Sequence, residues 1–132
     1  MKVTTAALCE QAHERPDGRI DILGVMHQLH APGFPAVQER MTAVFIIEWA
    51  ADEAGPQVLR ADLIGPGRRR ILTIEGETEV QPPAGGAPPQ TRLILPLEQV
   101  VFPEPGDYAF ELLAGGDVLS LCPLHLLHHA GD

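Results

Sequence analysis

The sequence has little of several residue types that enzymes use for covalent chemistry. Its 132 residues contain no asparagine, and Lys2 and Ser120 are the only lysine and the only serine. A phosphate-binding P-loop requires Gly-Lys-Ser/Thr and a hydrolase nucleophile elbow requires Gly-x-Ser-x-Gly, so both are excluded. A Schiff-base enzyme would have to use Lys2, next to the chain terminus. We therefore predict no catalytic residues and no bound cofactor.

Positive charge, long apolar runs and cysteine are scarce as well. Nine Lys and Arg residues face 18 Asp and Glu residues, which gives a formal charge of −9. Binding to nucleic acids and to anionic membranes depends on basic side chains, so we expect neither as a partner. No run approaches the ~20 apolar residues that span a bilayer, and the residues after Lys2 do not form a signal peptide. With only Cys9 and Cys122, we expect a cytoplasmic protein with two reduced thiols.

What the sequence does contain is apolar alternation with a period of two. In residues 107–113, for example, Tyr108, Phe110 and Leu112 face one way. Turn-forming Gly and Pro residues recur roughly every 8–12 residues, which is typical of an antiparallel sandwich or barrel. We expect an all-β antiparallel β-sandwich of seven or eight strands with little or no helix, apart from a helical turn at 35–40 or at the C-terminus. The expected strands are 3–10, 19–30, 41–50, 57–64, 69–81, 90–97, 107–114 and 117–127, in one domain over residues 1–132 with a flexible loop at 82–89.

One expected strand is apolar on both faces. Residues 41–50 read MTAVFIIEWA, with Glu48 as the exception. Such a pattern predicts a central strand that is covered on both sides. A homodimer would supply one of the covers; a second sheet and the loops of the same chain are the alternative. The expected core is Leu8, Ile22, Val44, Phe45, Ile46, Trp49, Leu63, Ile74, Leu95, Tyr108, Phe110 and Leu112.

Several short motifs resemble a known family. They are Val3-Thr4-Thr5, Leu8-Cys9, Ile22-Leu23-Gly24, Phe34-Pro35 and, above all, the stretch Phe102-Pro103-Glu104-Pro105-Gly106-Asp107-Tyr108-Ala109-Phe110. Together they resemble an uncharacterised bacterial family of small single-domain all-β proteins, a domain of unknown function. The resemblance covers most of the chain. It implies the fold but no activity and no catalytic residues.

Three histidines near the C-terminus are the candidate metal ligands. His125, His128 and His129 lie within CPLHLLHHAGD, and imidazole is a common ligand of zinc and other transition metals. On a helix, spacings of three and four would place all three on one face. On a strand, His125 and His129 would lie ~13 Å apart, too far for one ion. The alternative is an exposed terminus in which the neighbouring leucines pack.

Other polar clusters have simpler interpretations. His27 and His30 are expected to point to opposite faces of one strand. Glu75, Glu77 and Glu79 form a row of carboxylates on one face. The row either binds a hard cation or is a solvated surface. We expect Arg60 or Arg92 to neutralise this row across the strands, with Arg68-Arg69-Arg70 nearby also acting against it.

Two classes of function compete. The first is a non-enzymatic binding or interaction module whose partner is another protein or a second copy of the chain. The second is a ligand- or metal-binding site, with zinc at His125, His128 and His129 as the leading candidate. An enzyme built from Glu, Asp and His residues on several strands is the third and least favoured hypothesis.

Overall fold

A computed structural model of the chain describes residues 1–129, and in them the chain is almost entirely strand. Two short 3₁₀ turns, η1 (Ala51–Glu53) and η2 (Pro66–Arg68), interrupt the strands. The strands are β1 (Lys2–Glu14), β2 (Ile20–Val25), β3 (Gln28–Ala31), β4 (Ala36–Glu48), β5 (Gly55–Ile64), β6 (Arg70–Val80), β7 (Gln90–Phe102), β8 (Gly106–Ala114) and β9 (Asp117–His128). Within the described residues, no helix has the length and apolar character needed to cross a membrane.

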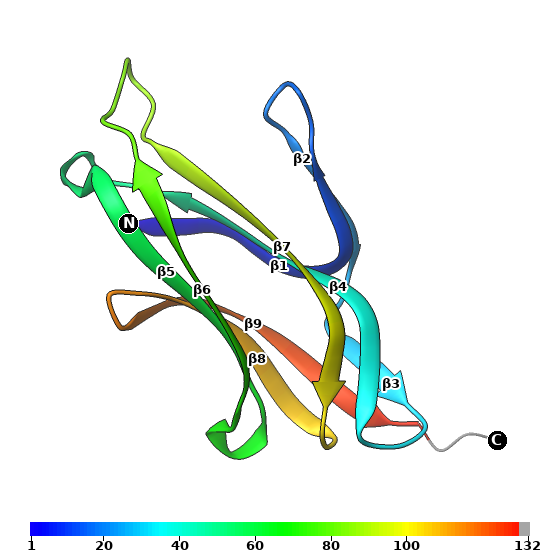
Figure 1. Ribbon diagram of the computed structural model, residues 1–132. Helices are drawn as coiled ribbons and strands as arrows, with labels where there is room; N and C mark the ends of the chain where they lie inside the picture. Colours follow the sequence, from blue (N-terminus) through cyan, green and yellow to red (C-terminus); the bar gives the residue numbers. More distant parts are fainter. Residues whose placement is uncertain (130–132) are drawn as a thin grey trace.

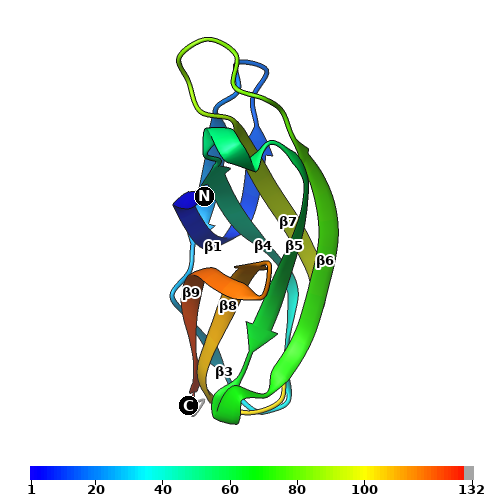
Figure 2. The ribbon, with the colours of Figure 1, turned by 90° about the vertical axis from the view of Figure 1, so that its left-hand side faces the viewer.

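The strands form two sheets (Figure 1). Sheet A has the order β2-β1-β4-β7, and sheet B has the order β3-β9-β8-β5-β6. All neighbours pair antiparallel except β3 and β9, which run parallel. The chain enters sheet B between β2 and β3 and returns to sheet A at β4. The turned view shows the edge strands β6 and β7 next to each other, joined by the long connection at residues 81–89 (Figure 2).

The two sheets share one hydrophobic core. Strand alternation sends every second side chain inward, as in Met41, Ala43, Phe45 and Ile47 of β4. Phe45 of sheet A meets Phe110 of sheet B with ring centroids 6.3 Å apart. The remaining core side chains are Leu8, Trp49, Leu59, Ala61, Leu63, Val80, Leu97, Val100, Phe102, Tyr108, Leu112, Ala114, Cys122, Leu124 and Leu126.

The all-β prediction is confirmed, but the described residues form nine strands instead of seven or eight, and one pair, β3 and β9, is parallel instead of antiparallel. Two local assignments are also wrong. The expected strand 19–30 is two strands, because the chain leaves β1 after Val25 and pairs with β9 from Gln28 onward. The expected helical turn at 35–40 is the beginning of β4, since Ala36 to Arg40 pair with β7. At both places, pairing with a strand that is distant in the sequence determines the structure.

The predicted core is largely confirmed. Eight of its members are buried, whereas Ile22, Ile46, Ile74 and Leu95 are half-buried. Val44 is fully buried but does not belong to the shared core cluster. Its neighbours in the chain, Ala43 and Phe45, point inward, so Val44 points to the outer face of sheet A.

The motif at 102–110 forms a closed turn before β8. The hydroxyl of Tyr108 donates to the carbonyl of Glu104 at 2.7 Å, and the ring of Tyr108 meets Phe102 edge-on at 5.1 Å. Burial raises the pKa of this hydroxyl. The tyrosine therefore anchors the turn to the core.

Candidate functional site

An apolar strip crosses the outer face of sheet A. The register places Cys9 between Val25 and Thr42, and Ala7 next to Val44. Residues directly opposite each other in a sheet share a face, so these side chains lie side by side. Including their partners on β7, the strip consists of Ala7, Leu23, Val25, Val44, Ile46, Ile94 and Pro96.

The strip is open at its β2 end. Leu23 and Val25 are 46% and 51% exposed and Pro96 is exposed, whereas Ala7, Ile46 and Ile94 are half-buried and Val44 is fully buried. All nine strands of the described residues belong to the two sheets, so no further layer of secondary structure covers this face. The exposed part of the strip, Leu23, Val25 and Pro96, therefore has no covering layer within residues 1–129.

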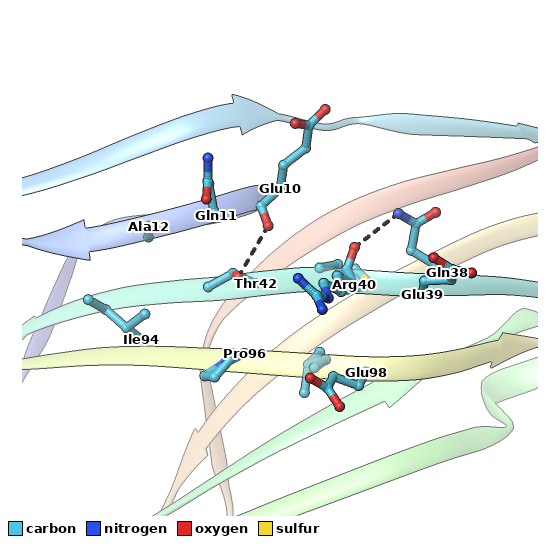
Figure 3. Close-up of a pocket in the computed structure, with 12 residues that line it drawn as sticks. Glu10, Gln11, Ala12, Gln38, Glu39, Arg40, Thr42, Ile94, Pro96 and Glu98 are labelled. Atoms are coloured by element: carbon cyan, nitrogen blue, oxygen red, sulfur yellow. Dashed lines mark hydrogen bonds between the residues drawn. The ribbon is translucent and has the colours of Figure 1, made fainter.

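A hollow of about 780 Å³ adjoins the strip where β1, β4 and β7 run together (Figure 3). We call it the acidic hollow, because Glu10, Glu39 and Glu98 line it together with Arg40. Its remaining lining residues are Gln11, Ala12, Gln38, Met41, Thr42, Ile94, Pro96 and Leu97. Ile94 and Pro96 belong to both features, so the hollow continues directly into the strip.

Hydrogen bonds to the backbone hold the polar side chains of the hollow. The Thr42 hydroxyl donates to the carbonyl of Glu10 at 3.5 Å, and Gln38 Nε2 donates to the carbonyl of Arg40 at 3.0 Å (Figure 3). The buried Cys9 thiol donates to the carbonyl of Thr42 at 3.5 Å, and burial raises its pKa. The carboxylates stay exposed, so the hollow offers negative charge to a partner.

The three predicted metal ligands lie on the last strand and just after it, and they make separate contacts. His125 Nδ1 lies 2.7 Å from Asp107 Oδ1, and His128 Nε2 donates to the carbonyl of Pro32 at 3.1 Å. The His129 ring meets the His30 ring edge-on, with centroids 6.2 Å apart. Over residues 1–129, no three His, Cys, Asp or Glu side chains are grouped so that they could hold a metal ion. Zinc binding by these histidines stays a prediction.

The arginines pair differently from our expectation. Arg60 Nε lies 3.2 Å from Asp62, Arg68 binds Glu111 at 2.8 Å, and Arg92 binds Glu14 at 3.0 Å. In residues 1–129 these three arginines form no ion pair with the exposed row on β6, although the register places Arg60 directly opposite Glu75. Asp62 and Glu111, which face each other across β5 and β8, are only 3% and 5% exposed. This buried pair was not predictable from the sequence, since both residues alternate like ordinary surface carboxylates.

The two cysteines are free. Cys122 points into the core, whereas Cys9 points to the outer face of sheet A. Burial raises the pKa of Cys122 to about 11 and suppresses its thiolate at neutral pH.

Comparison with known proteins gives a family and a distant structural similarity. The model of a family of unknown function (DUF6941) matches residues 4–127. No curated protein matches the chain. Among solved structures, the Pseudomonas fluorescens alkylpurine DNA glycosylase AlkC bound to DNA containing an abasic site analog is similar at 12% identity and a TM-score of 0.46. The similarity covers 92% of this chain and 30% of the glycosylase chain.

Proposed function

The chain belongs to DUF6941, a family of unknown function, and we propose that it is a protein-binding module whose docking surface is the outer face of sheet A. The observation that carries this proposal is the exposed part of the strip, in which Leu23 and Val25 of β2 and Pro96 of β7 lie on one face with the half-buried Ala7, Ile46 and Ile94. Exposed apolar surface that is continuous and flanked by polar groups is typical of interaction sites.

The acidic hollow supports a particular chemistry for the partner. Three carboxylates and one guanidinium line it, and the whole chain carries a formal charge of −9. Complementary charge steers association and selects among partners. We therefore propose a partner segment that places apolar side chains on the strip and Lys or Arg side chains in the hollow.

The same charges disfavour a second copy at this face. In a two-fold symmetric dimer the same patch would contact itself. Glu39 and Glu98 would then approach the same residues of the other copy, at a repulsive cost. A basic protein partner would neutralise the carboxylates of the hollow. A homodimer is the alternative that the experiment must distinguish from it.

Selection from a phage-displayed library of random peptides tests this function. We expect the enriched peptides to combine apolar residues with Lys or Arg. Val25→Glu should weaken their binding about tenfold or more, because it places a charge on the strip. Val118→Glu is the matched control, since Val118 is also a strand valine of similar exposure (49% against 51%) but lies on sheet B.

Three outcomes would contradict the proposal. They are a library that yields no binder, enriched peptides that are acidic, and peptides that bind the Val25→Glu and Val118→Glu variants equally. Charge reversal by Glu98→Lys separates the two parts of the surface. It should weaken binding of the basic peptides while leaving the fold intact, because Glu98 is exposed.

A further inference from the structure

A narrow apolar slot opens between the two sheets on the side where β6 and β7 form their edges. Its volume is about 110 Å³, and Leu59, Ala61 and Leu112 of the shared core form part of its lining. Ile74 on β6 and Leu93 and Leu95 on β7 are only half-buried there. The full lining is Leu59, Arg60, Ala61, Ile74, Gly76, Glu77, Leu93, Leu95 and Leu112.

The slot exists because one inward position of β6 has no side chain. The inward-facing residues of this strand are Leu72, Ile74, Gly76, Thr78 and Val80. A Cβ added at Gly76 would meet no atom within 4 Å. The glycine therefore leaves open space where its neighbours along the strand pack against the core.

Neither the backbone nor the packing of the described residues requires a glycine at this position. Gly24, Gly55 and Gly106, which also lie in strands, have positive φ angles of 69°, 113° and 137°, but Gly76 does not lie in that region. A glycine inside a strand weakens it, and such a residue often marks a bulge or the close approach of another group. The pairing of β5 with β6 has no bulge at Gly76, and the space above this glycine is open to a ligand.

We infer that the slot binds a small apolar ring or branched alkyl group of about six heavy atoms, seated on Gly76 between Leu93 and Leu95. An enclosed apolar cavity of about 150 Å³ binds benzene. The slot of about 110 Å³ is smaller and open at the exposed Gly76, so it can hold a group of that class without enclosing it completely. Burial of apolar surface would drive binding. This site lies between the sheets and is independent of the docking surface proposed on sheet A.

Benzene is the probe for this site, and the methyl NMR signals of Leu93 and Leu95 are the readout. We expect benzene to shift both signals in the wild-type chain. Gly76→Leu fills the slot, so it should weaken benzene binding about tenfold or more. Gly76→Ala fills it partly and should give an intermediate affinity, which keeps the test informative if the leucine variant does not fold.

Gly33→Leu is the matched control. Gly33 also lacks a positive φ angle and has no atom within 4 Å of an added Cβ, but it lies in the turn before β4. Its substitution should leave benzene binding unchanged. The inference is wrong if benzene does not shift Leu93 and Leu95, or if it binds the wild-type chain and the Gly76 variants with equal affinity.

Discussion

At the scale of single residues, the indole N–H of Trp49 is a buried hydrogen-bond donor whose stability depends on one acceptor. Its side chain is 2% exposed, and the indole N–H donates to the Thr91 hydroxyl at 2.8 Å. A buried donor that loses its partner costs the full desolvation of that group. This one hydrogen bond fixes the end of β4 against the beginning of β7.

We predict that Thr91→Val destabilises the fold by about 1–3 kcal/mol, because the indole N–H is left without an acceptor. Urea denaturation followed by the fluorescence of the only tryptophan measures the change. Thr4→Val is the control, since the exposed Thr4 hydroxyl donates to the carbonyl of Ile46 at 3.3 Å and water can replace that bond. Equal effects of the two substitutions would show that the Thr91 bond is not special.

Cys122 makes stability depend on pH above neutrality. Burial raises its pKa from 9.0 to about 11, so the folded chain holds the thiol proton over a range in which the unfolded chain releases it. The unfolded state binds fewer protons there, and stability falls as pH rises from the unfolded value toward the folded one. We predict a smaller loss of stability between pH 8 and about pH 10.5 in Cys122→Ala than in wild type. Parallel pH profiles of the two proteins would refute this account.

At the scale of elements, the turn η2 is attached to β8 by an ion pair. Arg68 Nη1 lies 2.8 Å from Glu111 Oε2, and the Glu111 side chain is 7% exposed while that of Arg68 is 72% exposed. The exposed guanidinium thus pairs with a carboxylate that is almost fully buried. This contact links β5 and β6, the strands on either side of the turn, to the centre of sheet B.

We predict that Arg68→Ala destabilises the chain, because the nearly buried Glu111 carboxylate loses its ion-pair partner. Arg69→Ala removes an equal charge from the next residue and should change stability by less than about 0.5 kcal/mol. Thermal unfolding of the three proteins gives the comparison. A larger loss in Arg69→Ala would mean that net charge matters and the Glu111 contact does not.

The elements also show how far the sequence can be interpreted. Alternation predicts β8 well, since its inward side chains Tyr108, Phe110 and Leu112 are decided by burial on one face. The division of residues 19–30 is not predictable in this way. It depends on the parallel pairing of Gln28 with His125, which is distant in the sequence. Local patterns carry no information about such a partner.

At the scale of the whole molecule, charge and apolar surface have opposite effects on association. The strip favours contact with another protein, but the formal charge of −9 and the carboxylates around the hollow repel a second copy. The double apolar pattern of residues 41–50 predicted that something covers both faces. The acidic hollow could not be predicted, because Glu10, Glu39 and Glu98 come from three strands and meet only in the sheet.

We predict a monomer in native mass spectrometry of untagged chain that is purified without chelator. A dimer that Val25→Glu dissociates would replace the basic partner by a second copy. The same spectrum tests the metal hypothesis. Stoichiometric zinc that is lost in both His125→Ala and His128→Ala would support it, and zinc retained in these variants would exclude the C-terminal histidines as its ligands.

The connection between β6 and β7 gives the molecule a place for a reporter. Nine residues, 81–89, span two edges that lie close together. A chain of that length can reach about 30 Å, several times the ~10 Å between packed sheets. A backbone hydrogen bond holds its last residue, because Trp49 N donates to the carbonyl of Pro89 at 2.9 Å. A fluorophore at Gly85 or Gly86 would thus be attached to a connection that is longer than the distance it spans. It would lie on the segment that joins the two strands bordering the slot, and it would not strain either sheet.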